Sequence, residues 1–168
     1  AGSVTIGVAA SAECPVVVVR GIAGPPGRLP VVVGVDGSTC SEAALAFAFA
    51  EASIRRAPLL AVHVWSDAMI DPIAAHAIDW AALALEAQEV LAERLAGWGE
   101  KYPDVEVGRR VVRDNAASTL VEMSVGAQLA VVGSHGRGPL RGALLGSVSQ
   151  ALLRHSSCPV AVVREEES

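Results

Sequence analysis

Short apolar runs recur along the chain and predict the strands of a sheet. Four runs are mostly apolar throughout, which is typical of parallel strands that are buried on both faces of a sheet. They lie at 29–36, 59–64, 129–132 and 160–163. A further segment, 105–112, alternates apolar and charged residues, so we expect it at an edge of the sheet.

Stretches with apolar residues at helical spacing separate these strands. One predicted helix begins at the capping box Thr39-x-x-Glu42 and runs to about Arg56, before Pro58. Three more helices are predicted over 77–101, 116–126 and 145–156. Gly126 occupies the position of a C-terminal helix cap, and residues 66–76 form a predicted polar loop.

The alternation of strands and helices predicts an α/β fold. We expect a five-stranded parallel doubly wound sheet of strand order 3-2-1-4-5, with helices on both faces. The winding of such a sheet reverses between its first and fourth strands, and ligands bind there at the carboxyl ends of the strands. The two most distinctive motifs of the sequence follow these two strands, so the fold places them opposite each other.

The start of the chain repeats its end. Residues 2–20 align with 146–164 without a gap at a constant offset of 144, and 9 of the 19 positions are identical. Duplication explains this better than chance, because Gly-Ser, Cys-Pro and a terminal Arg stay in register. We therefore expect four segments. They are a remnant of an upstream domain at 1–20, a Gly/Pro linker at 21–30, a complete domain at 31–164 and an acidic tail at 165–168.

Composition narrows the classes of function. The chain is 52% hydrophobic and 18% charged, as expected of a folded domain. A net charge of −5 without a Lys/Arg run argues against binding DNA or RNA. No apolar run approaches the roughly 20 residues that cross a membrane. Cys14, Cys40 and Cys158 lack metal-ligand spacing, so we predict no metal site and a reducing, cytoplasmic compartment.

The first motif, Gly34-Val35-Asp36-Gly37-Ser38, ends the first strand of the complete domain. A carboxylate at this position can accept a hydrogen bond from a ribose hydroxyl. In the simpler interpretation, Asp36 only starts a turn, and Ser38 or Thr39 caps the next helix. His63 lies in the middle of a predicted strand, where a buried structural histidine is more common than a ligand.

The second motif, Gly133-x2-Gly136-x9-Gly146-Ser147, follows the fourth strand. Glycines let backbone N–H groups converge on an anion, and the helix that opens at Gly146-Ser147 adds unpaired N–H groups at its N-terminus. The alternative is a surface loop whose glycines relieve strain. The segment lacks the Gly-Lys-Ser/Thr of a P-loop, and a dinucleotide fingerprint would follow the first strand instead. The two motifs together predict a nucleotide site.

These motifs, with the closing Cys158-Pro159-Val160, resemble the ATP-binding branch of the universal stress protein family. The tandem layout is most similar to two-domain members from actinobacteria. The resemblance spans 30–164, and residues 2–20 resemble the end of a preceding copy. It implies an adenine nucleotide α-hydrolase-like fold and ATP as the ligand, with Mg²⁺ bound through the phosphates.

The resemblance also implies a role for each matching residue. Asp36 bonds the ribose, while Gly34 and Val35 line the base. Val64 meets the adenine edge through its backbone, and Val132 flanks the nucleotide. The residues implied around the triphosphate are Gly133, His135, Gly136, Gly146, Ser147, Val148 and Ser149. Arg137 is either an added phosphate contact or a solvated side chain.

The predicted function is an ATP-binding regulatory module of a stress response. Similar family members bind ATP with at most weak hydrolysis, and no acidic group beyond Asp36 stands near the loop to position a water or a metal. We therefore predict no catalytic residue. An ATPase or nucleotidyl transferase and a nucleotide-free dimerisation module are the alternatives. The sequence leaves open the stress, the protein partner, and whether AMP or cyclic AMP competes with ATP.

The last strand also predicts how the chain assembles. Residues 160–163 should lie at a sheet edge, and an exposed apolar edge favours pairing with another strand. In tandem members of the family, the equivalent strands of the two copies pair with each other. We therefore predict antiparallel pairing of 16–19 with 160–163, either within one chain or by exchange in a homodimer.

Overall fold

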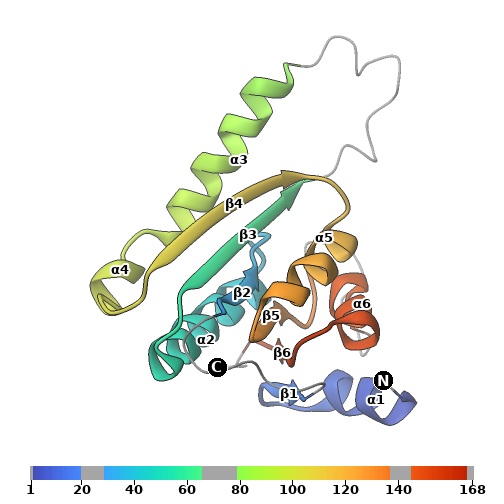
Figure 1. The fold of residues 1–168 in the computed structure, drawn as a ribbon. Coiled ribbons are helices and arrows are strands. Elements are labelled where there is room, and N and C mark those ends of the chain that lie inside the picture. Colours follow the sequence, from blue (N-terminus) through green and yellow to red (C-terminus); the bar gives the residue numbers. More distant parts are fainter. Residues whose placement is uncertain (1, 20–28, 66–78, 137–144, 166–168) are drawn as a thin grey trace.

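A computed structural model describes residues 2–19, 29–65, 79–136 and 145–165 (Figure 1). These residues form a six-stranded sheet in the order β1-β6-β5-β2-β3-β4. The strands are β1 (Val16–Val18), β2 (Val31–Gly34), β3 (Leu59–Trp65), β4 (Val107–Arg113), β5 (Leu129–Gly133) and β6 (Val160–Val163). The helices are α1 (Ser3–Ser11), α2 (Thr39–Arg55), α3 (Trp80–Leu95), α4 (Trp98–Lys101), α5 (Ala116–Met123) and α6 (Ser147–His155).

The sheet confirms the predicted fold class. The strands from β2 to β6 pair in parallel, and their order is the predicted 3-2-1-4-5. The uninterrupted Val, Leu and Ala runs form the central strands, because such side chains suit a sheet that is covered on both faces. The alternating segment forms β4, which lies at the predicted edge.

The start of the chain adds the sixth strand. β1 pairs antiparallel with β6, with Val16 opposite Val162 and Val18 opposite Val160. The predicted pairing is therefore confirmed, and here it occurs within one chain; exchange in a homodimer stays a prediction. α1 packs beside α6 and buries Ala9. The Arg164 guanidinium donates a hydrogen bond to the carbonyl of Ala10.

Two apolar clusters fill the opposite faces of the sheet. Alternate residues of a strand point to opposite faces, so Val31 and Val33 enter one cluster and Val32 enters the other. α2 and α3 cover the first face, and α5 and α6 cover the second, where α1 joins them. No helix of the described residues is long and apolar enough to cross a membrane.

The start of α2 corrects the predicted capping box. Ser38, not Thr39, is the N-cap: its backbone is extended and its Oγ accepts a hydrogen bond from the Ser41 N–H at 3.2 Å. Thr39 is the first residue inside the helix. The sequence pattern indicates a cap one residue too late, because Ser38 and Thr39 both carry a hydroxyl that can cap a helix.

The helix predicted over 77–101 is wrong as a single element. Asp79 caps α3, which ends at Leu95. Gly97 then adopts φ +79°, a left-handed conformation that interrupts the helix before α4 begins. The predicted cap at Gly126 is also wrong, because α5 ends at Met123 and Ser124–Gly126 form a 3-10 turn. The predicted loop 66–76 and the helix start at 77–78 lie outside the described residues.

Candidate functional site

A cavity of about 720 Å³ lies at the carboxyl ends of β2 and β5, where the winding reverses. Small-molecule sites usually measure about 300–1,000 Å³. Every predicted site residue in the described part of the chain lines this cavity. These residues are Gly34, Val35, Asp36, Val64, Val132, Gly133, His135, Gly136, Gly146, Ser147, Val148 and Ser149. Arg137 lies outside the described residues.

Asp36 has a structural role at the cavity wall. Its Oδ1 accepts hydrogen bonds from the Ser38 N–H at 2.9 Å and from the Ser38 hydroxyl at 2.6 Å. Gly37 adopts φ +77°, which lets the chain turn sharply between β2 and α2. The simpler interpretation of the motif therefore holds, since Asp36 starts a turn and Ser38 caps a helix. Asp36 also lines the cavity, so both interpretations are compatible.

Ser41 fixes the backbone on either side of Asp36, and sequence reasoning missed it. Its side chain is buried, and its Oγ accepts from the Gly37 N–H at 3.0 Å and more weakly from the Asp36 N–H at 3.4 Å. The same hydroxyl donates to the Ser38 carbonyl at 2.9 Å. A hydroxyl residue in the first turn of the following helix is the signal that could have identified it.

Close approach explains two of the glycines in the second motif. Among the described glycines only Gly37 and Gly97 have positive φ, so a left-handed backbone does not account for Gly133 and Gly136. A Cβ on Gly136 would lie 2.5 Å from Oδ2 of Asp36. A Cβ on Gly133 would lie 2.9 Å from the backbone carbonyl carbon of Cys40 in α2. The missing side chains thus let the two motifs touch.

The N-terminus of α6 lies at the cavity without a side-chain cap. Gly146 is its N-cap, and the N–H groups of the first helical turn have no partner within the helix. They give this end of the helix a partial positive charge. The Gly146 N–H donates to the Ser134 carbonyl at 2.8 Å, which holds the helix start against the loop. The Ser149 hydroxyl donates to the Gly133 carbonyl at 2.7 Å and so braces the end of β5.

The helical walls of the cavity were not predicted. Leu120 of α5 packs so closely on Gly34 that a Cβ there would lie 2.9 Å from Leu120 Cδ1. The other lining residues that sequence reasoning missed are Val62, Ala116, Leu145, Gln150, Ala151, Arg154 and His155. They belong to no motif, because an ordinary apolar helix pattern does not show which residues face a cavity.

Charge is distributed unevenly around this cavity. Asp36 is the one carboxylate among the described lining residues, whereas Arg154 and the His135 and His155 rings are potential cations. The described residues contain no group of three or more His, Cys, Asp or Glu side chains that could hold a metal ion. The excess of basic over acidic side chains around the cavity suits an anionic ligand.

His63 lies outside the cavity, as expected of a structural histidine. Its ring is buried, and its Nδ1 lies 2.7 Å from the carbonyl oxygen of Val35. Val62 and Val64 flank it in β3 and point to the opposite face, where they line the cavity. The hydrogen bond holds β3 against the residue that precedes Asp36.

The sequence profile of the universal stress protein family matches residues 28–164. The chain belongs to the universal stress protein family. The match includes both motifs and every residue that lines the cavity, while the first repeat lies outside it.

Individual relatives agree with this membership. Universal stress protein Rv2005c of Mycobacterium tuberculosis is 50% identical over 167 residues, which cover 98% of this chain and 56% of that protein. The chain thus spans about half the length of the curated relatives that it matches. The solved structure of universal stress protein UspA from Lactobacillus plantarum has a TM-score of 0.68 at 23% identity, covering 83% of this chain and 100% of its own.

A further solved structure is a universal stress protein in complex with cAMP. It is 26% identical to this chain with a TM-score of 0.61, and the match covers 82% of this chain and 97% of the other. The fold of this chain is therefore shared with these universal stress proteins.

Proposed function

We propose that this universal stress protein domain binds ATP in the cavity and acts as a regulatory module of a stress response, with at most weak hydrolysis. The proposal is carried by one observation. Asp36 and Gly136, which are far apart in sequence, meet at the wall of a cavity that residues of both motifs line.

The nucleoside half of the ligand occupies the side of the cavity formed by β2, β3 and β5. Asp36 accepts a hydrogen bond from a ribose hydroxyl, and the turn built by Ser38 and Ser41 holds its carboxylate there. Gly34 and Val35 line the adenine, which Val64 meets through its backbone. Val132 and Leu120 supply an apolar surface for the base.

The triphosphate occupies the side formed by the glycine loop and α6. In this proposal the phosphates lie against the loop residues Gly133, His135 and Gly136. The N–H groups of Ser147 and Val148, in the first turn of α6, donate hydrogen bonds to them. Arg137 is an added contact in this proposal. Mg²⁺ is bound mainly through the phosphates, because Asp36 is the one carboxylate among the described residues of the cavity.

Two further observations support an adenine nucleotide. One similar solved structure is that of a universal stress protein in complex with cAMP, which shares adenine and ribose with ATP. The cavity also has the volume of a small-molecule site and an uncapped helix N-terminus at one end.

Calorimetric titration of the purified chain with ATP and Mg²⁺ tests the proposal. We expect binding that weakens by at least about tenfold in Asp36→Ala and in Gly136→Val, since the first removes the ribose acceptor and the second fills the approach to Asp36. Asp114→Ala is the matched control, because Asp114 lies outside the cavity. Absence of binding at millimolar ATP would refute the proposal.

The same samples separate binding from turnover and ATP from other adenine nucleotides. AMP and cyclic AMP are added as competitors, and equal affinity for AMP and ATP would contradict a triphosphate site at α6. Phosphate release is followed in parallel. Turnover above background that disappears in Asp36→Ala would favour the alternative, an ATPase or nucleotidyl transferase.

A further inference from the structure

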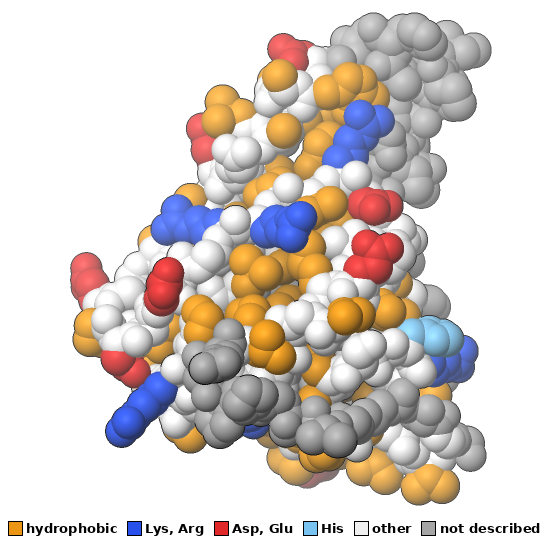
Figure 2. All heavy atoms as spheres, in the orientation of Figure 1, with side chains coloured by type: hydrophobic (Ala, Val, Ile, Leu, Met, Phe, Trp, Pro, Cys, Tyr) orange, Lys and Arg blue, Asp and Glu red, His pale blue; other side chains and the backbone are white. Residues whose placement is uncertain are grey.

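A second hollow, which we name the α5 groove, lies on the face of the sheet beside α5. It measures about 450 Å³, and its apolar surface comes from Val32, Leu60, Val112 and Met123. Figure 2 shows apolar side chains gathered on this face over the middle of the sheet, with basic and acidic side chains around them. The groove shares no lining residue with the cavity described above.

The α5 groove marks a gap in the helical layer. Helices normally cover both faces of a parallel sheet. On this face α5 packs against α6 and contacts β3, and α6 contacts β5 and β6, whereas β4 receives its main helix contact from α3 on the other face. Leu60 and Val112 are therefore only half-buried by the chain itself.

Thr119 adds a polar group to the wall of the groove. The residue is 5% exposed, and its buried Oγ1 has no hydrogen-bond partner among the described residues. A buried hydroxyl without a partner is unfavourable, because it has lost its hydrogen bonds to water and forms none within the protein. A ligand with a hydrogen-bonding group at this point of the groove would relieve that cost.

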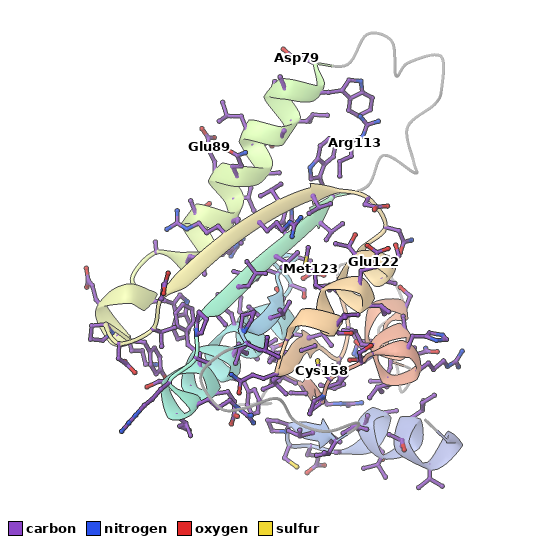
Figure 3. The ribbon with its side chains drawn as sticks, in the orientation of Figure 1. Asp79, Glu89, Arg113, Glu122, Met123 and Cys158 are labelled. Atoms are coloured by element: carbon purple, nitrogen blue, oxygen red, sulfur yellow. The ribbon has the colours of Figure 1, made fainter. Side chains whose placement is uncertain are left out.

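Charges of opposite sign stand at the rim. Arg110 projects from β4, and Glu122 stands on α5; both are exposed, and neither forms an ion pair with a described residue. Figure 3 labels Glu122 and Met123 on α5, with Met123 toward β3. Asp114, at the end of β4, adds a second carboxylate. An occupant that fits this rim carries an acidic group toward Arg110 and basic groups toward Glu122 and Asp114.

The shape of the groove decides between a second copy of this chain and another protein. Two copies that met through this face about a two-fold axis would place hollow against hollow. To fill the groove, a partner needs a convex element. A helix, with a diameter of about 10 Å, is the element that usually covers the face of a parallel sheet.

We propose that the α5 groove docks an amphipathic helix of a partner protein. The apolar face of that helix packs on Leu60, Val112 and Met123, and a polar side chain reaches Thr119. Its acidic residues face Arg110 and its basic residues face Glu122. Helices that dock in apolar grooves use anchors at i, i+3, i+4 and i+7, and we expect the same spacing here. The proposal does not depend on nucleotide binding.

A displayed library of helical peptides tests this docking. Leu is fixed at the anchor positions, and the flanking positions vary among Glu, Lys, Ser and Gln. Peptides selected on the full chain are synthesised with a fluorescent label, and their affinities are measured by anisotropy. We expect Arg110→Glu to weaken binding by at least about tenfold, and peptides with Glu exchanged for Lys to recover affinity for that variant.

Arg109→Glu is the matched control. Arg109 is the neighbouring residue of the same strand, but it lines the hollow between β4 and α3 on the opposite face. We expect its affinity for the peptides to stay within about twofold of the wild type. Thr119→Val keeps the side-chain shape, so we expect an unchanged or higher melting temperature together with weaker peptide binding.

Three outcomes would overturn the proposal. The library could yield no enriched peptide, or peptides that bind Arg110→Glu and the wild type equally. Alternatively, sedimentation could show a wild-type dimer that dissociates in Arg110→Glu but not in Arg109→Glu, which would assign the groove to a second copy of the chain.

Discussion

The two repeats, residues 2–20 and 146–164, have the same pattern but different surroundings. Each forms a helix followed by a strand, and the two strands pair with each other. Val163 is 3% exposed, whereas its counterpart Val19 is 73% exposed. Cys158 is buried and Cys14 is exposed. The shared pattern thus specifies helix and strand, while neighbouring elements decide how deeply each is buried.

The same contrast holds for the candidate site. Gly146 opens α6 between the Ser134 carbonyl and the cavity. Its counterpart Gly2 opens α1, and a Cβ added there would have no heavy atom within 4 Å beyond its own chain neighbours. A Gly-Ser helix start lines a cavity only where a strand end and a loop are packed against it. The comparison can be tested by changing matched positions of the two repeats.

The largest expected difference concerns the two helices. Leu152 of α6 is fully buried, and its counterpart Val8 of α1 is 50% exposed. We expect Leu152→Ala to lower the free energy of unfolding by about 2–5 kcal/mol, because it leaves a cavity in the core. Val8→Ala should change it by less than about 0.5 kcal/mol. Urea denaturation measures both values, and equal losses would contradict the contrast in burial.

The next difference concerns ATP affinity. Gly146→Val places a branched side chain beside the loop and the first turn of α6, and we expect ATP to bind at least about tenfold more weakly, or about 1.4 kcal/mol. Gly2→Val carries the same change at the matched position and should leave the affinity unaltered. Calorimetry measures both, with circular dichroism to verify folding. Loss of affinity in Gly2→Val would show that the first repeat contributes to the site.

The smallest difference concerns alkaline pH. Burial raises the pKa of the Cys158 thiol, so the folded chain keeps this proton to a higher pH than the unfolded chain does. This contribution to stability is fully present below the ordinary thiol pKa and is lost as the pH rises through the raised value. We expect Cys158→Ala to flatten the alkaline decline of the unfolding free energy, measured by denaturation across pH.

Cys14→Ala is the control for that measurement, because Cys14 is exposed and should leave the alkaline decline unchanged. Iodoacetamide provides an independent check on the native protein. It should label Cys14 readily and spare Cys158 until the chain unfolds. Equal labelling of the two thiols would show that Cys158 is accessible and would remove the basis of the predicted pH effect.

Sequence reasoning predicted the sheet more accurately than the helix ends. The apolar runs identified β2, β3, β5 and β6, since a strand buried on both faces needs uninterrupted apolar residues, and the alternating segment identified the edge strand β4. Helix boundaries depend on single residues, and the same type can act in two ways. Gly97 takes a left-handed conformation and ends a helical segment, whereas Gly126 lies in a 3-10 turn without positive φ.

The amino-acid sequence by itself determined the order of the elements, the pairing of the two repeated strands and the two motifs at the reversal of the winding. The order of the elements and the place of the motifs depend on local patterns and on the fixed handedness of parallel crossovers, while the pairing follows from the exposed apolar edge of the last strand. Only the tertiary structure decided why Gly133 and Gly136 lack side chains, which helices wall the cavity and where the α5 groove lies. Each of these depends on distances between residues that are far apart in sequence, such as Asp36 and Gly136, and such distances exist only once the sheet has brought the strand ends together.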